Sequence, residues 1–87
     1  MNDPHIGQLV MERYGDIILI GHIGDAYDVE NYSTPKNPQN RTERFYSIEW
    51  IYSSNSEFKC GYYHGYTEKV IIKLKKSFDN FKDSLNE

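Results

Sequence analysis

Residues 45–52 alternate between large and polar side chains with a period of two. This alternation predicts a strand that buries one face and exposes the other. The face that is large and mostly apolar comprises Tyr46, Ile48, Trp50 and Tyr52. Because Trp50 is the only tryptophan of the chain and brings a large apolar area, we expect it to anchor the core.

Two apolar runs flank a turn signal near the start of the chain. The pattern predicts a first strand over residues 6–14, a turn at Gly15 and Asp16, and a second strand that begins with the continuous apolar run 17–20. A continuous run is typical of a strand that is covered on both faces. We therefore expect the chain's own helix or a second subunit to cover the face of this run that points away from the core.

The middle of the chain predicts a bend, a third strand and a long loop. Gly21 and Gly24 interrupt the apolar pattern, and glycine inside a strand often marks a bulge or a sharp bend. A third strand over residues 26–32 follows. Residues 33–43 include two prolines and no large apolar side chain, so we expect an exposed loop there. The alternating strand described above and a return strand over residues 57–63 bring the number of strands to five.

The hydrophobic period changes towards the end of the chain. Apolar side chains then recur three and four residues apart, at Ile71, Leu74, Phe78, Phe81 and Leu85. This spacing predicts one apolar stripe on a helix over about residues 67–85. Thr67 is a suitable N-cap, and Glu68 adds a negative charge to the first turn. The β-branched residues 70–72 leave a short final strand open as an alternative for the first turn.

The composition fits one small domain over residues 1–87. A domain of this size buries only roughly 60% of the surface of its unfolded chain, so self-association would add to its stability. The single cysteine forms no internal disulfide and fits a reducing compartment. No basic and apolar leader opens the chain, and no apolar run approaches the ~18 residues of a membrane span. We therefore expect a cytoplasmic protein with no membrane partner.

Charge is distributed unevenly along the chain. Residues 1–32 contain six acidic residues and one arginine, whereas residues 33–87 contain nine basic and seven acidic residues. This polarity would steer a partner or pair two copies head to tail, although solvated surface charge is the simpler explanation. The net charge of −3 is low for a nucleic-acid binder, which is usually more basic.

The sequence pattern does not point to catalysis or to a metal. Cys60 and His64 are the only close pair of sulfur and nitrogen ligands, and no second pair completes a tetrahedral zinc set. Cys60 falls in a predicted strand, where a free cysteine is usually a small buried side chain. No acidic residue stands beside His64 to orient it. We therefore predict no enzymatic activity, no catalytic residue, no cofactor and no metal site.

Aromatic and basic side chains are the candidates for contact with a partner. The tyrosines that precede the helix, with the aromatic residues of the neighbouring strand, would form an aromatic pocket for a cation or a platform for stacked bases. The alternative is a core with ordinary surface tyrosines. Basic side chains would contact phosphates or an acidic partner, or simply be solvated. The candidate partner-binding residues are Tyr62, Tyr63, Tyr66, Arg41, Arg44, Lys69, Lys73 and Lys76.

Several short motifs resemble those of small Src-homology-3-like barrels. Residues 7–10 (GQLV) are similar to the opening strand of these barrels, residues 21–23 (GHI) to their bent second strand, and residues 46–50 (YSIEW) to the first strand of their central hairpin. The entry into the helix at residues 66–68 (YTE) resembles that of short uncharacterised proteins encoded by tailed phages. The resemblance covers about residues 6–80 and implies a strongly bent, five-stranded antiparallel barrel with a C-terminal α-helix.

Sm-like RNA-binding proteins are similar, strongly bent barrels that assemble into rings. Their helix usually comes first, whereas the helix predicted here comes last. Residues 25–28 (DAYD) do not match the Asp-x-x-Asn type of RNA loop that this family carries. The resemblance therefore assigns no binding residue to this chain.

We predict a mainly β small barrel that acts as a non-catalytic interaction module and self-associates through apolar strand surface. The alternative is an RNA- or single-stranded nucleic-acid-binding barrel of the Sm-like kind, in which tyrosines stack on bases and basic residues contact phosphates. A protein partner fits the first function and RNA fits the second. An enzyme is the least favoured function, because no acid, base and nucleophile converge in the pattern.

Overall fold

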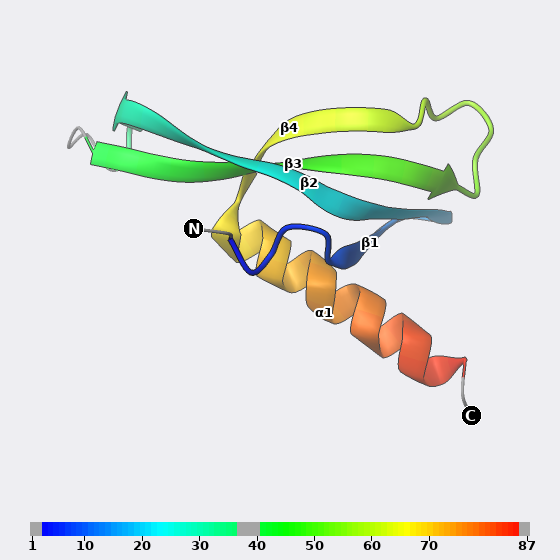
Figure 1. The fold of residues 1–87 in the computed structure, drawn as a ribbon. Coiled ribbons are helices and arrows are strands. Elements are labelled where there is room, and N and C mark those ends of the chain that lie inside the picture. The colour runs from blue at the N-terminus through cyan, green and yellow to red at the C-terminus, as the bar shows by residue number, and fades with distance from the viewer. Residues whose placement is uncertain (1–2, 37–40, 86–87) are drawn as a thin grey trace.

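The computed structural model describes residues 3–36 and 41–85. Over these residues, one antiparallel sheet contains four strands in chain order, and a helix follows it. The elements are β1 (Leu9–Tyr14), β2 (Ile17–Tyr32), β3 (Arg41–Ser53), β4 (Gly61–Thr67) and α1 (Glu68–Ser84). Figure 1 shows β2 and β3 as long twisted neighbours, with α1 on one side of the sheet beside β1. The prediction of a mainly β domain with a C-terminal helix is confirmed.

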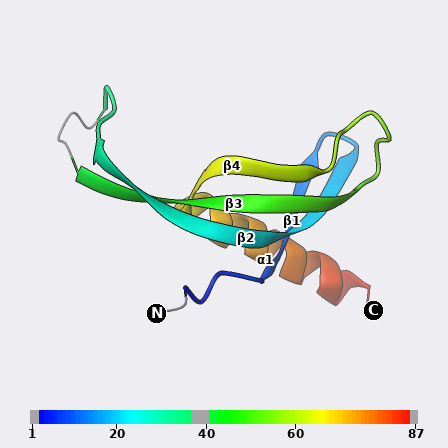
Figure 2. The same cartoon turned by 45° about the horizontal axis from the view of Figure 1, so that its top comes forward.

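The predicted five-stranded closed barrel is wrong. The segment that the sequence analysis divided into a second and a third strand is one strand of 16 residues, β2. The register of β2 against β3 shifts after Ile20 and again after Ile23, so β2 bends at bulges without ending. Within the described chain β1 pairs with β2 and β4 pairs with β3, and the two outer strands do not pair with each other. The result is the open, curved sheet of Figure 2.

Gly21 permits the bend because its backbone approaches that of β3 very closely. Gly21 pairs with Trp50, and a Cβ added to Gly21 would lie 3.0 Å from the Trp50 Cα and closer still to the Glu49 carbonyl oxygen. Both neighbours are backbone atoms, which cannot move aside to make room for the Cβ as the end of a flexible side chain could. The extra residue of the bulge is Ile51, since Ile20 pairs with Tyr52 and the next pair is Gly21 with Trp50.

The hydrophobic core lies on the inner face of the sheet, against the first half of α1. Its buried residues come from β1, β2, β3 and α1, and they are Val10, Leu19, Ile23, Tyr46, Ile48, Trp50, Ile71 and Leu74. Trp50 is 1% exposed, which confirms the expected anchor. Tyr52 was predicted on the same face, but it is 51% exposed because the bulge at Ile51 shifts the alternation of the strand.

The helix begins where its capping signals predict. The Thr67 hydroxyl accepts a hydrogen bond from the Val70 amide at 3.4 Å, and Glu68 lies in the first turn. The second half of the helix lies along β1. Phe78 lines a depression with Leu9, and other residues near the helix end line a second depression with β1. α1 therefore covers β1 rather than the outer face of β2.

The connection between β2 and β3 and the connection between β3 and β4 differ in length from the predicted ones. β3 begins at Arg41, so the last three residues of the predicted loop 33–43 lie in a strand, and residues 37–40 fall outside the described part of the chain. Beyond the ends of β1 and β4, β2 and β3 continue as a two-stranded arm formed by residues 28–32 and 41–44 (Figure 1). The return strand starts at Gly61, four residues later than expected.

A charged contact ties the segment before β1 to the core. The Asp3 carboxylate, 7% exposed, accepts a hydrogen bond from the Tyr46 hydroxyl at 2.8 Å and lies 3.4 Å from the Arg44 guanidinium. Burial by itself raises the pKa of Asp3, but the His5 amide, the Tyr46 hydroxyl and the Arg44 charge outweigh it and hold the pKa below its ordinary 3.8. Burial and the Asp3 hydrogen bond raise the pKa of Tyr46 to about 12.

We expect Asp3→Asn to lower the free energy of unfolding by about 1 to 3 kcal/mol at neutral pH, because the charge-assisted bonds to Tyr46 and Arg44 are lost. The folded pKa of Asp3 lies below its unfolded value, so its contribution is complete above the unfolded pKa and is lost as the pH falls through the folded pKa. The difference between wild type and Asp3→Asn should stay constant from neutral pH to about pH 5 and shrink below about pH 4. Urea unfolding at a series of pH values measures this, and a difference independent of pH would contradict it.

Candidate functional site

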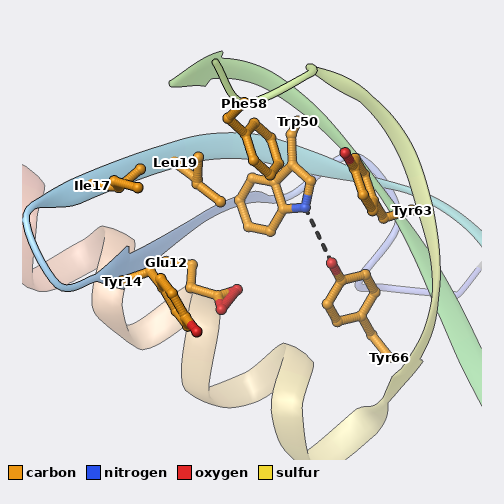
Figure 3. A pocket seen from close by; sticks show the side chains of 8 residues that line it. All are labelled: Glu12, Tyr14, Ile17, Leu19, Trp50, Phe58, Tyr63 and Tyr66. Carbon is orange, nitrogen blue, oxygen red and sulfur yellow. Dashed lines mark hydrogen bonds between the residues drawn. The ribbon is translucent and has the colours of Figure 1, made fainter. Parts of the chain in front are cut away.

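A pocket of about 330 Å³ opens on the inner face of the sheet (Figure 3). Both outer strands contribute to it, so the pocket lies between the two strands that a closed barrel would have paired. The lining residues are Glu12, Tyr14, Ile17, Leu19, Trp50, Phe58, Tyr63 and Tyr66. Pockets that bind small molecules are typically ~300–1,000 Å³ and mostly apolar with a few polar groups, and this pocket fits that description.

Aromatic rings form most of the wall, and hydrogen bonds fix their positions. The rings of Trp50 and Tyr66 meet edge to face, with centroids 6.5 Å apart and planes at 74°. The Trp50 indole N–H donates to the Tyr66 hydroxyl at 3.1 Å, as Figure 3 shows. Phe58 and Tyr63 stack at 5.5 Å, and the Tyr63 hydroxyl donates to the Lys59 carbonyl at 2.8 Å. The wall is therefore preorganised.

Glu12 supplies the negative charge of the pocket. Figure 3 shows its carboxylate on the side of the pocket that faces Tyr66. Glu12 forms no hydrogen bond or ion pair with any residue in the described ranges. Burial raises the pKa of the Tyr66 hydroxyl, the hydrogen bond from Trp50 lowers it, and the nearby Glu12 charge raises it, with a net increase. Tyr66 therefore stays protonated at neutral pH.

The structure separates the predicted tyrosines. Tyr63 and Tyr66 line the pocket, whereas Tyr62 lies on the outer face, because successive side chains of a strand point to opposite faces. On that face Tyr62 covers Gly24, where an added Cβ would lie 2.7 Å from the tyrosine ring. Two of the three tyrosines therefore belong to the pocket, and the third does not.

The predicted basic residues lie away from the pocket wall. Arg41 and Arg44 are on the arm, and carboxylates pair with both of them. The Arg41 Nε lies 3.3 Å from a carboxylate oxygen of Glu43. The Arg44 Nε lies 3.4 Å from a carboxylate oxygen of Asp3 and 3.8 Å from one of Asp28 in β2. The predicted lysines, Lys69, Lys73 and Lys76, are on α1. Lys73 lines a depression next to the pocket together with Glu12 and Tyr66. The eight candidates thus form no single surface, and contact of each with a partner stays a prediction.

Five lining residues were not predicted from the sequence as site residues, namely Glu12, Tyr14, Ile17, Leu19 and Phe58. One signal for Glu12 was present. Glu12 stands two residues after the buried Val10, so it occupies the inner face of β1, where an apolar side chain is expected. A carboxylate in phase with a buried face points either to a buried partner or to a binding site.

A serine and a histidine meet on the outer face without forming a catalytic set. The Ser47 hydroxyl lies 2.6 Å from His64 Nδ1. Ser47 is only 2% exposed, so a substrate could not reach it, and Glu49 pairs with His22 at 2.6 Å rather than orienting His64. Cys60, which was expected to be buried in a strand, is exposed in the turn before β4.

In residues 3–36 and 41–85, no group of three or more histidine, cysteine, aspartate and glutamate side chains could hold a metal ion. No helix in the same ranges combines the length and the apolar character that crossing a membrane requires.

Comparison of the chain with models of protein families, with curated proteins and with solved structures finds no match. The resemblance to Src-homology-3-like, Sm-like and phage-encoded proteins therefore stays a prediction from short motifs.

We expect Tyr66→Phe to lower the free energy of unfolding by about 1 to 3 kcal/mol, because the buried Trp50 indole N–H loses its acceptor. Tyr14→Phe is the matched control, since Tyr14 also lines the pocket but makes no hydrogen bond with a described residue, and its effect should stay within about 0.5 kcal/mol. Urea unfolding followed by tryptophan fluorescence compares the two. Equal losses in both variants would contradict the assigned bond.

Proposed function

We propose that this chain is a non-catalytic binding module and that the aromatic pocket between β1 and β4 is its ligand site. The single observation that carries this proposal is a pocket of about 330 Å³ whose aromatic walls are held in place by hydrogen bonds. Apolar wall exposed to water costs about 25 cal/mol per Å², and a bound apolar group would recover part of this free energy. A preformed wall also lowers the entropy cost of binding.

The chemistry of the wall supports binding rather than catalysis. The described lining residues supply one carboxylate and several tyrosine hydroxyls, and they include no histidine, cysteine, serine or lysine. Covalent or acid–base catalysis needs a nucleophile beside a base, or an acid and a base with separated pKa values. Tyr66 has a raised pKa and donates a proton poorly at neutral pH.

A screen of small neutral and charged compounds tests the binding function. The Trp50 indole N–H gives the only indole resonance of the protein, and it lies in the pocket wall. We expect some compounds to shift this resonance and those of Glu12 and Tyr66 in ¹H–¹⁵N spectra. The variant Ile17→Phe should narrow the pocket and weaken the shifts, whereas Tyr52→Ala on the outer face should leave them unchanged. A screen in which no compound moves the indole resonance would overturn the proposal.

Self-association is a second candidate function, and an apolar patch on the outer face favours it. We call Ile18, Ile20, Ile51 and Tyr52 the outer patch. Ile51 is 56% exposed and Tyr52 is 51% exposed, and the bulge places both on the face away from the core. Ile18 and Ile20 are half-buried, and the helix does not cover this face. A second copy is the occupant that we propose, because residues 1–32 carry one basic and six acidic residues whereas residues 33–87 carry nine basic and seven acidic residues, a polarity that favours a head-to-tail pair.

The double variant Ile51→Lys/Tyr52→Lys should shift the protein towards the monomer, because two charges would have to be desolvated in the contact. Light scattering coupled to gel filtration measures the mass over a range of concentrations. Ile72→Lys is the matched control, since Ile72 is equally exposed but lies on α1. A wild type that keeps the 10.3 kDa mass of one chain at millimolar concentration would rule out this function.

Nucleic-acid binding gains less support from the arrangement. Carboxylates already pair with Arg41 and Arg44, and the predicted tyrosines point to both faces of β4. A stacking platform for bases needs aromatic and basic side chains on one surface. We therefore place this function below the other two.

A further inference from the structure

We propose that the aromatic pocket binds a substituted ammonium cation, that is, an amine that carries methyl or other alkyl groups on its nitrogen. This inference rests on the proposed binding function and names the class of ligand. Two independent features of the pocket support it, namely the aromatic wall and the unpaired carboxylate.

The aromatic wall offers a surface that attracts cations. A cation is attracted to the face of a tryptophan, tyrosine or phenylalanine ring when it lies within ~6 Å of the ring centre, and cages of such rings bind quaternary ammonium groups. In this pocket Trp50 is 1% exposed and forms the base, whereas the accessible rings are those of Tyr66, which meets Trp50 edge to face, and of Phe58 and Tyr63, which stack on each other. Tyr14 completes the wall on the β1 side. Rings from three separate segments of the chain therefore surround one small volume.

The unpaired carboxylate gives the pocket its charge preference. Glu12 is half-buried and has no ion-pair or hydrogen-bond partner in the described ranges. An opposite charge beside a half-buried carboxylate gains more there than in bulk water. Lys73 lines the neighbouring depression together with Glu12, but no ion pair joins the two side chains. A cationic ligand would supply the missing partner.

The same features disfavour other classes of ligand. An anion would meet Glu12 and would find no arginine, lysine or histidine among the described lining residues. An unsubstituted ammonium group has three N–H donors, and leaving them without acceptors is costly. Beyond the Glu12 carboxylate, the only other acceptors in the described wall are tyrosine hydroxyls, and the Tyr66 oxygen already accepts from Trp50, so an unsubstituted ammonium would satisfy only part of its N–H groups. Alkyl groups on the nitrogen remove this demand and pack against the rings.

The experiment compares a cation with a neutral molecule of the same shape. Choline and its uncharged isostere 3,3-dimethylbutan-1-ol are titrated into the full chain, with Trp50 fluorescence and the indole N–H resonance as readouts. We expect choline to bind at least about tenfold more tightly than the isostere. Glu12→Gln should remove most of this preference while leaving the affinity for the isostere unchanged, and the retained affinity shows that the variant is folded.

Two controls isolate the role of Glu12. Glu30→Gln removes an exposed carboxylate from the arm and should leave choline binding unchanged. This variant changes the net charge of the protein by the same amount as Glu12→Gln but leaves the pocket unaltered. A peptide with one trimethylated lysine, and the same peptide with plain lysine, replace choline in a second titration. Tighter binding of the methylated peptide assigns the cation to a protein side chain, and tighter binding of choline assigns it to a free small molecule.

Four outcomes would overturn the inference. Equal affinity for choline and the isostere, or choline binding that Glu12→Gln leaves unchanged, would show that the pocket does not select a cation, while the binding function would stand. If neutral compounds from the screen bind but no cation does, the preference for a cation would likewise be overturned while the binding function would stand. Absence of binding by every compound would overturn the binding function as well.

Discussion

The close approach of Gly21 to the backbone of β3 is the constraint on which the rest of the structure depends. The absence of a Cβ lets the backbone of β2 approach that of β3 closely at the Gly21–Trp50 pair, and the bulge at Ile51 absorbs the change of register. The bend curves the sheet, as Figure 2 shows. The inner face becomes a trough with Trp50 at its base, and the pocket is the part of this trough that the core leaves open.

The pocket follows from the way the sheet stops short of closing. β1 and β4 face each other across the trough without pairing, and α1 lies along β1. The side chains that would fill a closed barrel instead line an opening, with Glu12 on one wall and Tyr66 on the other. Hydrogen bonds from Trp50 and Tyr63 keep the rings in place. Shape, aromatic surface and a carboxylate without a partner in the described ranges are thus products of the same bend.

Local signals in the sequence were sufficient for some elements and insufficient for others. The strand around Trp50 and the helix with its Thr67 cap were predictable, because periodicity and capping act over a few residues. The number of strands was not, because glycine can either end a strand or bend it, and only the pairing partner decides. The exposure of Tyr52 depends on a bulge that alternation alone does not reveal. The Asp3–Tyr46 bond joins residues 43 positions apart, and no local pattern marks it.

The residues of the candidate site could likewise be predicted from the sequence only in part. Tyr63 and Tyr66 were candidates because they are aromatic, whereas the use of Glu12 depends on β1 and β4 lying opposite each other.

The most direct test of the central claim is a nuclear Overhauser spectrum of the protein in solution. We expect contacts between the Gly21 and Trp50 α-protons and between the Trp50 indole and the Tyr66 ring, with no backbone contacts between β1 and β4. Regular backbone contacts between β1 and β4, or an indole without contact to Tyr66, would contradict it.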